Sequence, residues 1–495
     1  MAEAGAQTVE ATFCPQSRRI YVLVAAILAS SMAFIDGSVL SIAIPSLRAD
    51  LGATLADAQW VSNGYLLFLG SLLLLGGAAG DRFGLRLVFG LGIGVFVAAS
   101  MVCALAPQVG VLIVARAVQG IGAALMIPGS LAIIAKAYPK AERGRATGTW
   151  AAASSLTTIM GPVLGGFVLT ALGNWSWRLV FAINLPLGGI ALALLILRVP
   201  VDGARARRKL DIVGAVLASL GLMLLAFGLT GSGSESVPPL SHIVIYCCAG
   251  LLSLAWFVWW ELWTEHPMLP LRLFTIRQFS GANALTFILY FALTGTTFYL
   301  PMTLIGGWGA SPAEVSMVML PFGIALLSGL SGRWADRFGA GPPITVGAVW
   351  VGLAFAGLAV TAPLQQIWQA VLPLMCMAGV GMALVVSPLS TAVMTAVDDD
   401  DTGIASGTNN AVSRVAGLVA VAAMGMLAAL VFERALGGAA ELPVYFGLAA
   451  DGLSPQDEAM RQLATNAAFS TIAYFNAGLC LASAVVAWLT LERKG

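Results

Sequence analysis

Three charged side chains stand inside long apolar stretches of the chain, where a charge is costly. Asp36, Arg116 and Arg414 each lie well within a run long enough to cross a bilayer. Burial favours the protonated form of a carboxyl group, whereas a nearby guanidinium favours the carboxylate. An acid held between these two effects can take up a proton on one side of a membrane and release it on the other. Asp36, with a guanidinium nearby, therefore predicts proton chemistry within a membrane, whereas Arg414 could attract an anionic group, neutralise carbonyl groups or be structural.

Helical geometry predicts that Asp36 and Arg116 lie at a similar depth. At about 1.5 Å of rise per residue, they lie roughly 12 Å and roughly 9 Å from the same end of their spans. We expect a proton-coupling pair. A static ion pair that stabilises packing is the alternative, and direct contact of Asp36 with a cationic substrate is compatible with proton coupling. The position matching Arg116 in the second half of the chain is Met375, which favours a functional role.

The elements that position these charges are membrane helices. The chain has 495 residues, of which 59% are hydrophobic and only 10% charged, and its mean hydropathy is +0.90. Such a composition is typical of an all-α polytopic membrane protein. Fourteen apolar runs are long enough to span a bilayer. They cover residues 20–44, 58–80, 87–106, 110–135, 145–172, 178–198, 212–231, 242–262, 280–301, 313–332, 342–362, 364–390, 403–432 and 467–491.

Several classes of protein are disfavoured by the composition. A net charge of +1 gives no reason to expect a nucleic-acid partner, and six scattered cysteines show neither disulfide-framework nor metal-site spacing. Only two histidines are present, and no arrangement typical of a hydrolase active site appears. The small-residue run at 120–129 lacks the Lys-Ser/Thr ending of a phosphate-binding loop. We expect no enzyme activity, no metal and no cofactor, with a proton gradient as the energy source.

Charge distribution predicts the orientation. If both termini are cytoplasmic, nineteen of the 25 Lys and Arg residues fall on the inside and four outside, which are Arg48, Arg178, Arg434 and Arg461. This asymmetry agrees with the positive-inside rule. The first apolar run is too long for a signal peptide, so we expect an uncleaved first helix.

The sequence DRFG occurs twice, at 81–84 and at 336–339, each time after the second apolar run of a six-run block. The runs GIGAALMIP at 120–128 and GVGMALVVSP at 379–388 form a second repeated pair, in the fourth run of each block. Two related halves are typical of transporters. We therefore predict a cytoplasmic segment at 1–19, six-helix bundles at 20–198 and 280–491, a linker with two inserted helices at 199–279, and a cytoplasmic end at 492–495.

At these motifs the chain resembles the major facilitator superfamily, and within it the fourteen-helix drug:proton antiporter branch of EmrB/QacA type. The resemblance covers nearly the whole chain. It rests on GAAGDRFGLR at 77–86, RAVQGIG at 116–122, the glycines from 148 to 166, FIDGSVLSIAIP at 34–45 and SGTNNAVSRVAG at 406–417. Leu85 replaces a usual basic residue, and Thr157 replaces one usual glycine.

The resemblance implies roles for two groups of residues. A cytoplasmic gate is implied at Gly77, Asp81, Arg82, Gly84, Arg86, Asp336, Arg337 and Gly339. An antiporter motif on the fifth helix is implied at Gly148, Gly161, Pro162, Gly165 and Gly166. We expect Asp81 to be the main latch of the gate and Asp336 the weaker one, so that Asp81→Asn costs more transport than Asp336→Asn.

The leading hypothesis is a proton-coupled exporter of small amphipathic or cationic compounds, such as drugs, that works by alternating access. Candidate residues for the substrate cavity are Phe34, Trp60, Tyr65, Gln119, Tyr290, Phe298, Asn409, Asn410 and Arg414. A dedicated metabolite or lipid exporter and a non-transporting sensor or scaffold remain as alternatives. We expect a monomer in the bacterial cytoplasmic membrane, whose partners are the substrate, protons and lipid. An accessory periplasmic protein is left open.

Overall fold

The computed structural model describes residues 13–202, 209–231, 237–325, 330–437, 444–450 and 452–492. The regular elements of this described part are helices. Most of the predicted N-terminal segment 1–19, the last three residues and the basic stretch 205–208 lie outside it.

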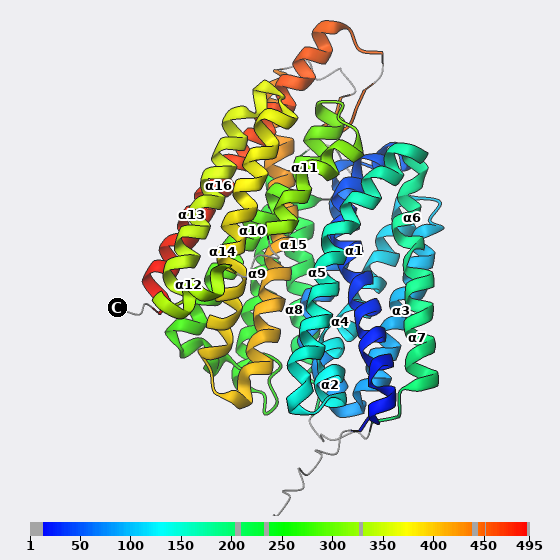
Figure 1. The fold of residues 1–495 in the computed structure, drawn as a ribbon. Coiled ribbons are helices and arrows are strands. Elements are labelled where there is room, and N and C mark those ends of the chain that lie inside the picture. Colours follow the sequence, from blue (N-terminus) through cyan, green and yellow to red (C-terminus); the bar gives the residue numbers. More distant parts are fainter. Residues whose placement is uncertain are drawn as a thin grey trace, which may run out of the picture.

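The first half of the chain forms one bundle, shown in blue to green in Figure 1. Its helices are α1 (Arg19–Leu51), α2 (Leu55–Phe83), α3 (Leu85–Ala104), α4 (Val109–Ala137), α5 (Lys140–Leu172), α6 (Trp177–Ala182) and α7 (Asn184–Arg198). The short helix α6 and α7 follow one another directly and together form the sixth predicted span. Helix α1 ends where Gly52 adopts a left-handed conformation, with φ of 61°.

The second half contains an inserted pair and a second bundle. The inserted helices are α8 (Ile212–Thr230) and α9 (Leu240–Trp263). The bundle comprises α10 (Arg277–Met302), α11 (Pro312–Ala325), α12 (Leu330–Phe338), α13 (Gly341–Thr361), α14 (Leu372–Thr395), α15 (Thr402–Leu436) and α16 (Pro455–Thr490). Helix α16 begins twelve residues before the predicted span because Ser454 caps it by accepting a hydrogen bond from Asp457 N.

The prediction of an all-helical membrane protein is confirmed. Within the described part, thirteen helical segments are long and apolar enough to cross a bilayer. The remaining predicted span, at 313–332, coincides with α11 and the start of α12, and residues 326–329 between them lie outside the description. Helices α8 and α9 pack together, and α8 also contacts α2 and α15. The inserted pair therefore touches both halves.

Equivalent glycines give the two halves equivalent helix crossings. In the first half, a β-carbon on Gly122 of α4 would lie 2.6 Å from Phe96 N of α3. In the second half, a β-carbon on Gly381 of α14 would lie 2.7 Å from Gly347 O of α13. The glycines of the two DRFG sequences, Gly84 and Gly339, both have positive φ, of 99° and 84°. Only glycine adopts this geometry readily, so the turn at the end of each DRFG sequence requires glycine for the same reason.

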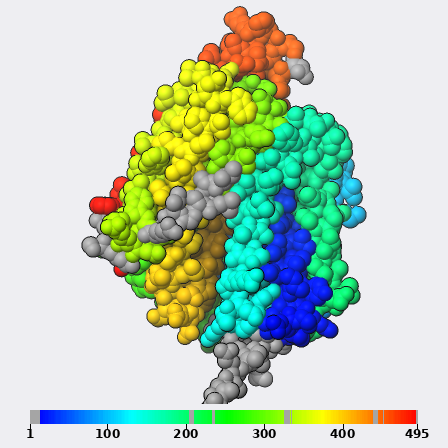
Figure 2. All heavy atoms as spheres, viewed as in Figure 1, coloured from blue at the N-terminus to red at the C-terminus, as the bar shows by residue number. Residues whose placement is uncertain are grey.

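We name the two ends of the molecule by their turns: the Gly52 end, at the top of Figure 1, and the Gly84 end, at the bottom. At the Gly52 end the bundles are tied together. Arg48 Nη1 donates to Phe446 O at 2.7 Å, and Thr170 Oγ1 accepts from Ala313 N at 2.9 Å. Slightly deeper, Gln59 Nε2 donates to the Tyr299 hydroxyl at 2.9 Å. Figure 2 shows the seam between the bundles, with α5 in cyan along one side.

Candidate functional site

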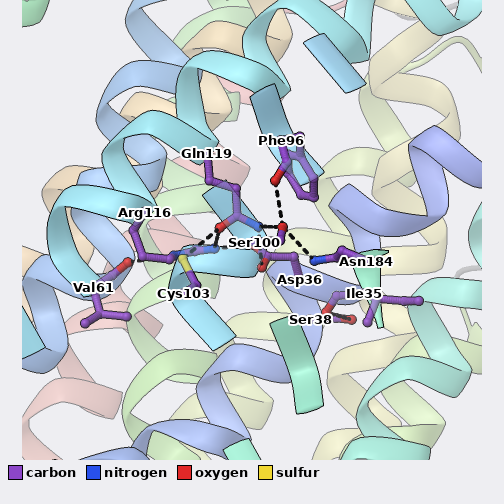
Figure 3. A network of polar contacts seen from close by, with 10 residues as sticks. All are labelled: Ile35, Asp36, Ser38, Val61, Phe96, Ser100, Cys103, Arg116, Gln119 and Asn184. Atoms are coloured by element: carbon purple, nitrogen blue, oxygen red, sulfur yellow. Dashed lines mark hydrogen bonds and ion pairs between the residues drawn. The ribbon is translucent and has the colours of Figure 1, made fainter. Parts of the chain in front are cut away.

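Asp36 of α1 and Arg116 of α4 form an ion pair in the interior of the first bundle (Figure 3). Arg116 Nη1 lies 2.5 Å from Asp36 Oδ2. The two side chains are 1% and 0% exposed, which leaves essentially no water to screen them. The structure thus brings together the two charges that the sequence placed at a similar depth.

Gln119, one helical turn after Arg116, contacts both charges. Its Oε1 accepts from Arg116 Nη1 at 2.7 Å, and its Nε2 donates to Asp36 Oδ1 at 3.2 Å. The same Nε2 donates to Ser100 Oγ at 2.8 Å, and Asn184 Nδ2 donates to that hydroxyl at 3.2 Å. The sequence predicted Gln119 as a cavity residue, whereas the structure buries it completely within this network.

Arg116 has further partners that hold it in place without Asp36. Its Nε donates to the Val61 carbonyl of α2 at 3.0 Å. Its guanidinium carbon lies 4.4 Å from the Tyr65 ring centre and 5.6 Å from that of Phe181, within the range of a cation–π interaction. Arg116 is therefore held by Val61, Gln119 and two aromatic rings in addition to Asp36.

Glycines of α5 pack directly on the turn of α1 that carries Asp36. A β-carbon on Gly165 would lie 2.4 Å from Val39 Cγ1, and one on Gly161 would lie 3.2 Å from Ser38 Oγ. Gly166 faces the other bundle, where a β-carbon would lie 2.6 Å from Pro312 O of α11. Within the described part, Gly148 has open space beside it. One stretch of α5 thus contacts both the acid-bearing helix and the opposite bundle, with Pro162 inside it.

The predicted gate residues lie at the Gly84 end. Arg86 donates from Nε to Leu195 O at 3.2 Å and from Nη2 to Ile196 O at 2.8 Å, both at the end of α7. Asp81 is exposed and makes no hydrogen bond or ion pair with any residue that the structure describes. The guanidinium of Arg82 lies 5.1 Å from the Phe83 ring centre. A β-carbon on Gly77 would lie 3.9 Å from Pro128 Cβ, an ordinary van der Waals distance.

Sequence reasoning missed Asp202, which follows α7 and caps α3. Its carboxylate accepts from Leu85 N and Arg86 N, each at 2.9 Å, and pairs with Lys136 Nζ at 2.6 Å. Burial alone would raise the pKa of Asp202, but these hydrogen bonds outweigh burial and place the pKa below its usual value. In the sequence this role is signalled by a single acid after the sixth span. A single acid at such a place looks the same as a solvated loop residue.

The second copy of the gate motif is also exposed. Asp336 and Arg337 lie on the surface at the end of α12, and the Arg337 guanidinium stands 5.2 Å from the Phe338 ring centre. Gly339 is buried. The expected order of effects for Asp81 and Asp336 remains a prediction.

Three cavity candidates lie on α15, a helix of the second bundle that packs against α2 of the first. Asn409 of α15 donates to Thr286 Oγ1 at 2.7 Å and to Asn283 Oδ1 at 3.3 Å, both on α10. Asn410 is exposed. Arg414 is half-buried beside Gly70 of α2 and has no hydrogen bond or ion pair with any described residue.

Other cavity candidates are placed differently. Trp60 packs against inserted helix α8, where its Nε1 donates to Gly231 O at 3.1 Å. Phe298 is 5% exposed and packs edge-to-face on Tyr299 within the core. Tyr65 lies under Arg116, whereas Phe34 and Tyr290 are half-buried. Hydropathy cannot separate these faces, because lipid, neighbouring helices and a cavity all accept aromatic rings.

Within the described ranges, no group of three or more His, Cys, Asp or Glu side chains is placed to hold a metal ion. None of the six cysteines, all of which lie in the described ranges, forms a disulfide bond.

Comparison with known proteins agrees with this arrangement. The profile of the Major Facilitator Superfamily matches residues 26–421 and 282–495. The methylenomycin A resistance protein of Bacillus subtilis is 34% identical over 419 residues, covering 83% of this chain and 88% of that protein. The probable actinorhodin transporter of Streptomyces coelicolor is 33% identical over 430 residues, covering 83% of this chain and 73% of its own length.

A third relative is the tetracenomycin C resistance and export protein of Streptomyces glaucescens, 30% identical over 415 residues, with 82% of this chain and 75% of that protein covered. Among solved structures, a bacterial homologue of the human lysosomal transporter Spinster, in an inward-facing and unoccupied conformation, superposes with a TM-score of 0.67. That match is 14% identical and covers 97% of this chain and all of the other, so it bears on the fold alone. The chain belongs to the Major Facilitator Superfamily.

Proposed function

We propose that this protein is a proton-coupled efflux transporter that exports small amphipathic compounds by alternating access of its two bundles. The observation that carries the proposal is the buried Asp36–Arg116 pair, bridged by Gln119 and covered by the glycines of α5. A charged pair in a membrane interior is costly unless it has a role, and proton exchange supplies one. The three relatives are named for resistance or for transport of antibiotics, which supports export.

The geometry suggests how a proton could be coupled to movement. Proton binding to Asp36 Oδ2 would replace the ion pair with a neutral acid, and Arg116 would remain with Val61 O, Gln119 and the Tyr65 ring. The attraction that holds α1 to α4 would then weaken. Because Gly161 and Gly165 pack on the same turn of α1, and Gly166 packs on α11, a shift of α1 reaches the other bundle through α5.

We place the Gly84 end in the cytoplasm of a bacterial cell, with both termini there and fourteen membrane helices in all. The basic residues gathered at that end support this orientation. The bundle–bundle hydrogen bonds described at the Gly52 end correspond to a state closed toward the outside. In the opposite state, Asp81 would latch the cytoplasmic side by facing a helix N-terminus of the second bundle, which favours a carboxylate by up to about 1 kcal/mol.

The surroundings of Asp36 and Arg414 bear on the type of cargo. Asp36 is fully engaged by Arg116, whereas Arg414 is half-buried and lacks a described partner. A cation in this position favours cargo that carries an acidic group in addition to an apolar body. This observation supports the second candidate, a dedicated exporter of an acidic metabolite, more than export of lipophilic cations. In either case we propose a monomer that needs no accessory protein for the proton step.

Expression in a bacterial host that lacks its own major drug exporters tests the proposal. The panel should contain acidic, neutral and cationic amphipathic compounds, with growth inhibition and cellular accumulation measured with and without a protonophore. We expect the protein to lower the cellular accumulation of at least one class of compound. Both the protonophore and Asp36→Asn, at equal expression, should abolish this reduction. Protection that survives Asp36→Asn would contradict proton coupling through this residue. Failure across the whole panel would contradict export of amphipathic compounds.

A further inference from the structure

Two buried carboxyl groups meet between the inserted helices, far along the chain from Asp36. Asp211 precedes α8, and Glu261 lies in the last turn of α9. The residues are 7% and 4% exposed. Asp211 Oδ1 accepts from Gly214 N at 2.9 Å and from Trp260 Nε1 at 2.8 Å, while Glu261 Oε2 accepts from Leu269 N at 2.9 Å. One oxygen of each carboxyl group is therefore held firmly.

The other oxygen of each group is buried without a partner. Asp211 Oδ2 and Glu261 Oε1 accept no hydrogen bond. A β-carbon built on Gly214 would lie 2.5 Å from the former and 2.7 Å from the latter, so both oxygens crowd the same small space. Any residue larger than glycine at position 214 would displace them. The two orphaned oxygens thus face one region from opposite helices.

No cation neutralises this pair among the residues that the structure describes. Lys209 is exposed on one side, and Glu265 and His266 are exposed beyond the end of α9. On α2, Asp81 is exposed and Arg82 lies over the Phe83 ring. At the start of α15, Asp401 is paired with Arg272. Within the described chain, none of these groups forms a hydrogen bond or ion pair with Asp211 or Glu261.

Two adjacent buried carboxylates whose facing oxygens lack donors cannot both remain ionised, because each charge is poorly solvated and repels the other. One bound proton both supplies the missing donor and lowers the repulsion between the two groups. Bound to either orphaned oxygen, it becomes the donor of a hydrogen bond to the other, and the charge of the pair falls from two negative units to one.

We propose that Asp211 and Glu261 form a second proton-binding site, in which one shared proton fastens the ends of α8 and α9 together at the Gly84 end. The site also holds Leu269 N, so it reaches the connection from α9 to the second bundle. It is separate from the Asp36 network and does not depend on the transport proposal. The inserted helices therefore carry a proton of their own.

Infrared spectroscopy of the purified full-length protein in liposomes tests this site, because a protonated carboxyl group has a carbonyl stretch that a carboxylate lacks. We expect a band of this kind at neutral pH in the wild type and its loss in Glu261→Gln. Asp36→Asn is the matched control and should retain the band. An unchanged spectrum in Glu261→Gln would overturn the proposal. If that variant does not fold, Asp211→Asn serves the same purpose.

Thermal stability against pH gives an independent readout. In Glu261→Gln the side-chain amide can donate to Asp211 Oδ2 without any titrating proton. We expect the Tm of the wild type to fall more steeply than that of the variant as pH rises, because rising pH removes the shared proton. Parallel curves would overturn the proposal. So would a wild-type Tm that responds to Mg²⁺ at constant pH while the protonated band is missing, since a metal would then occupy the space.

Discussion

The two bundles share one helix plan but differ in the polar groups at their centres. In the first bundle α4 carries Arg116, which pairs with Asp36 of α1. In the second, the equivalent helix α14 carries the buried Met375, and neutral groups join α15 to α10, with Asn409 donating to Thr286 and Asn283. Arg414 of α15 is half-buried and has no hydrogen bond or ion pair with any described residue. Under the proposed function, we assign proton exchange to the first bundle and cargo recognition to the second.

The largest expected effect comes from making the first bundle resemble the second. Arg116→Met would leave Asp36 buried without a cation, and removing one partner of a buried ion pair typically costs about 3–5 kcal/mol. We expect a large loss of stability in detergent and a loss of transport. The double variant Arg116→Met with Asp36→Asn should recover much of the stability, though not the transport. Equal stability of the single and double variants would show that the pair is not coupled.

A second test compares equivalent glycine contacts in the two bundles. Gly165→Ala on α5 would place a β-carbon 2.4 Å from Val39 Cγ1, whereas Gly417→Ala on α15 would place one 3.3 Å from Thr294 Oγ1. Overpacking of this kind costs about 1–3 kcal/mol. We expect Gly165→Ala to reduce both Tm and transport, Gly417→Ala to do so less, and Gly148→Ala to change neither. If all three variants lost transport to the same extent, the α1–α5 contact would have no specific role in transport.

Arg414→Gln tests the role of the second bundle. Because Arg414 has no described partner, its loss should change stability little. Hydrogen bonds to charged groups contribute about 1.5–3 kcal/mol, so the apparent affinity for acidic cargo should fall by roughly 10-fold or more. Transport of neutral cargo is the internal control. An equal effect on acidic and neutral compounds would assign Arg414 a packing role.

The smallest expected effect concerns how the third helix of each bundle begins. In the first bundle the Asp202 carboxylate accepts from Leu85 N and Arg86 N, whereas in the second the Glu492 backbone carbonyl accepts from Gly341 N at 3.0 Å. Asp202→Ala should cost about 1 kcal/mol of folding free energy near pH 7.

The effect should depend on pH in a defined direction. Because the folded-state pKa of Asp202 lies below the unfolded value, its contribution is present above the unfolded pKa and is lost as pH falls through the folded one. The Tm difference between wild type and Asp202→Ala should therefore shrink as the pH is lowered below about 4. A difference that is constant with pH would contradict an electrostatic cap.

Much of the fold could be predicted because lipid imposes a simple rule on sequence. Long apolar runs locate the helices, and the repeated DRFG and glycine pairs reveal two related halves. The Asp36–Arg116 pair could also be anticipated, since intramembrane charges are few and helical rise fixes their depth. The polar partners could not be predicted in this way. Gln119, Ser100 and Asn184 acquire their roles only when three helices converge, and hydropathy does not report which face of a helix they occupy.

Residues at the ends of spans escaped prediction for a different reason. Asp202, Asp211 and Glu261 stand where a chain leaves the membrane, and charged residues there are usually solvated. Their burial depends on the path of the connecting segment, which short motifs do not specify. Helix α16 likewise begins before its apolar run, because a capped polar helix continues the membrane span without any change in periodicity.

Transport driven by an imposed pH gradient tests most directly whether Asp36 couples proton movement to cargo movement. Wild type and Asp36→Asn should be reconstituted in vesicles at equal density, with a vesicle interior more acidic than the outside and a cargo identified in cells. Cargo movement should be recorded together with internal pH. We predict that the wild type moves cargo against protons and dissipates the gradient in proportion, whereas Asp36→Asn does neither. Cargo-linked proton movement of the same size in both proteins would contradict the assignment of Asp36 as the proton-coupling residue.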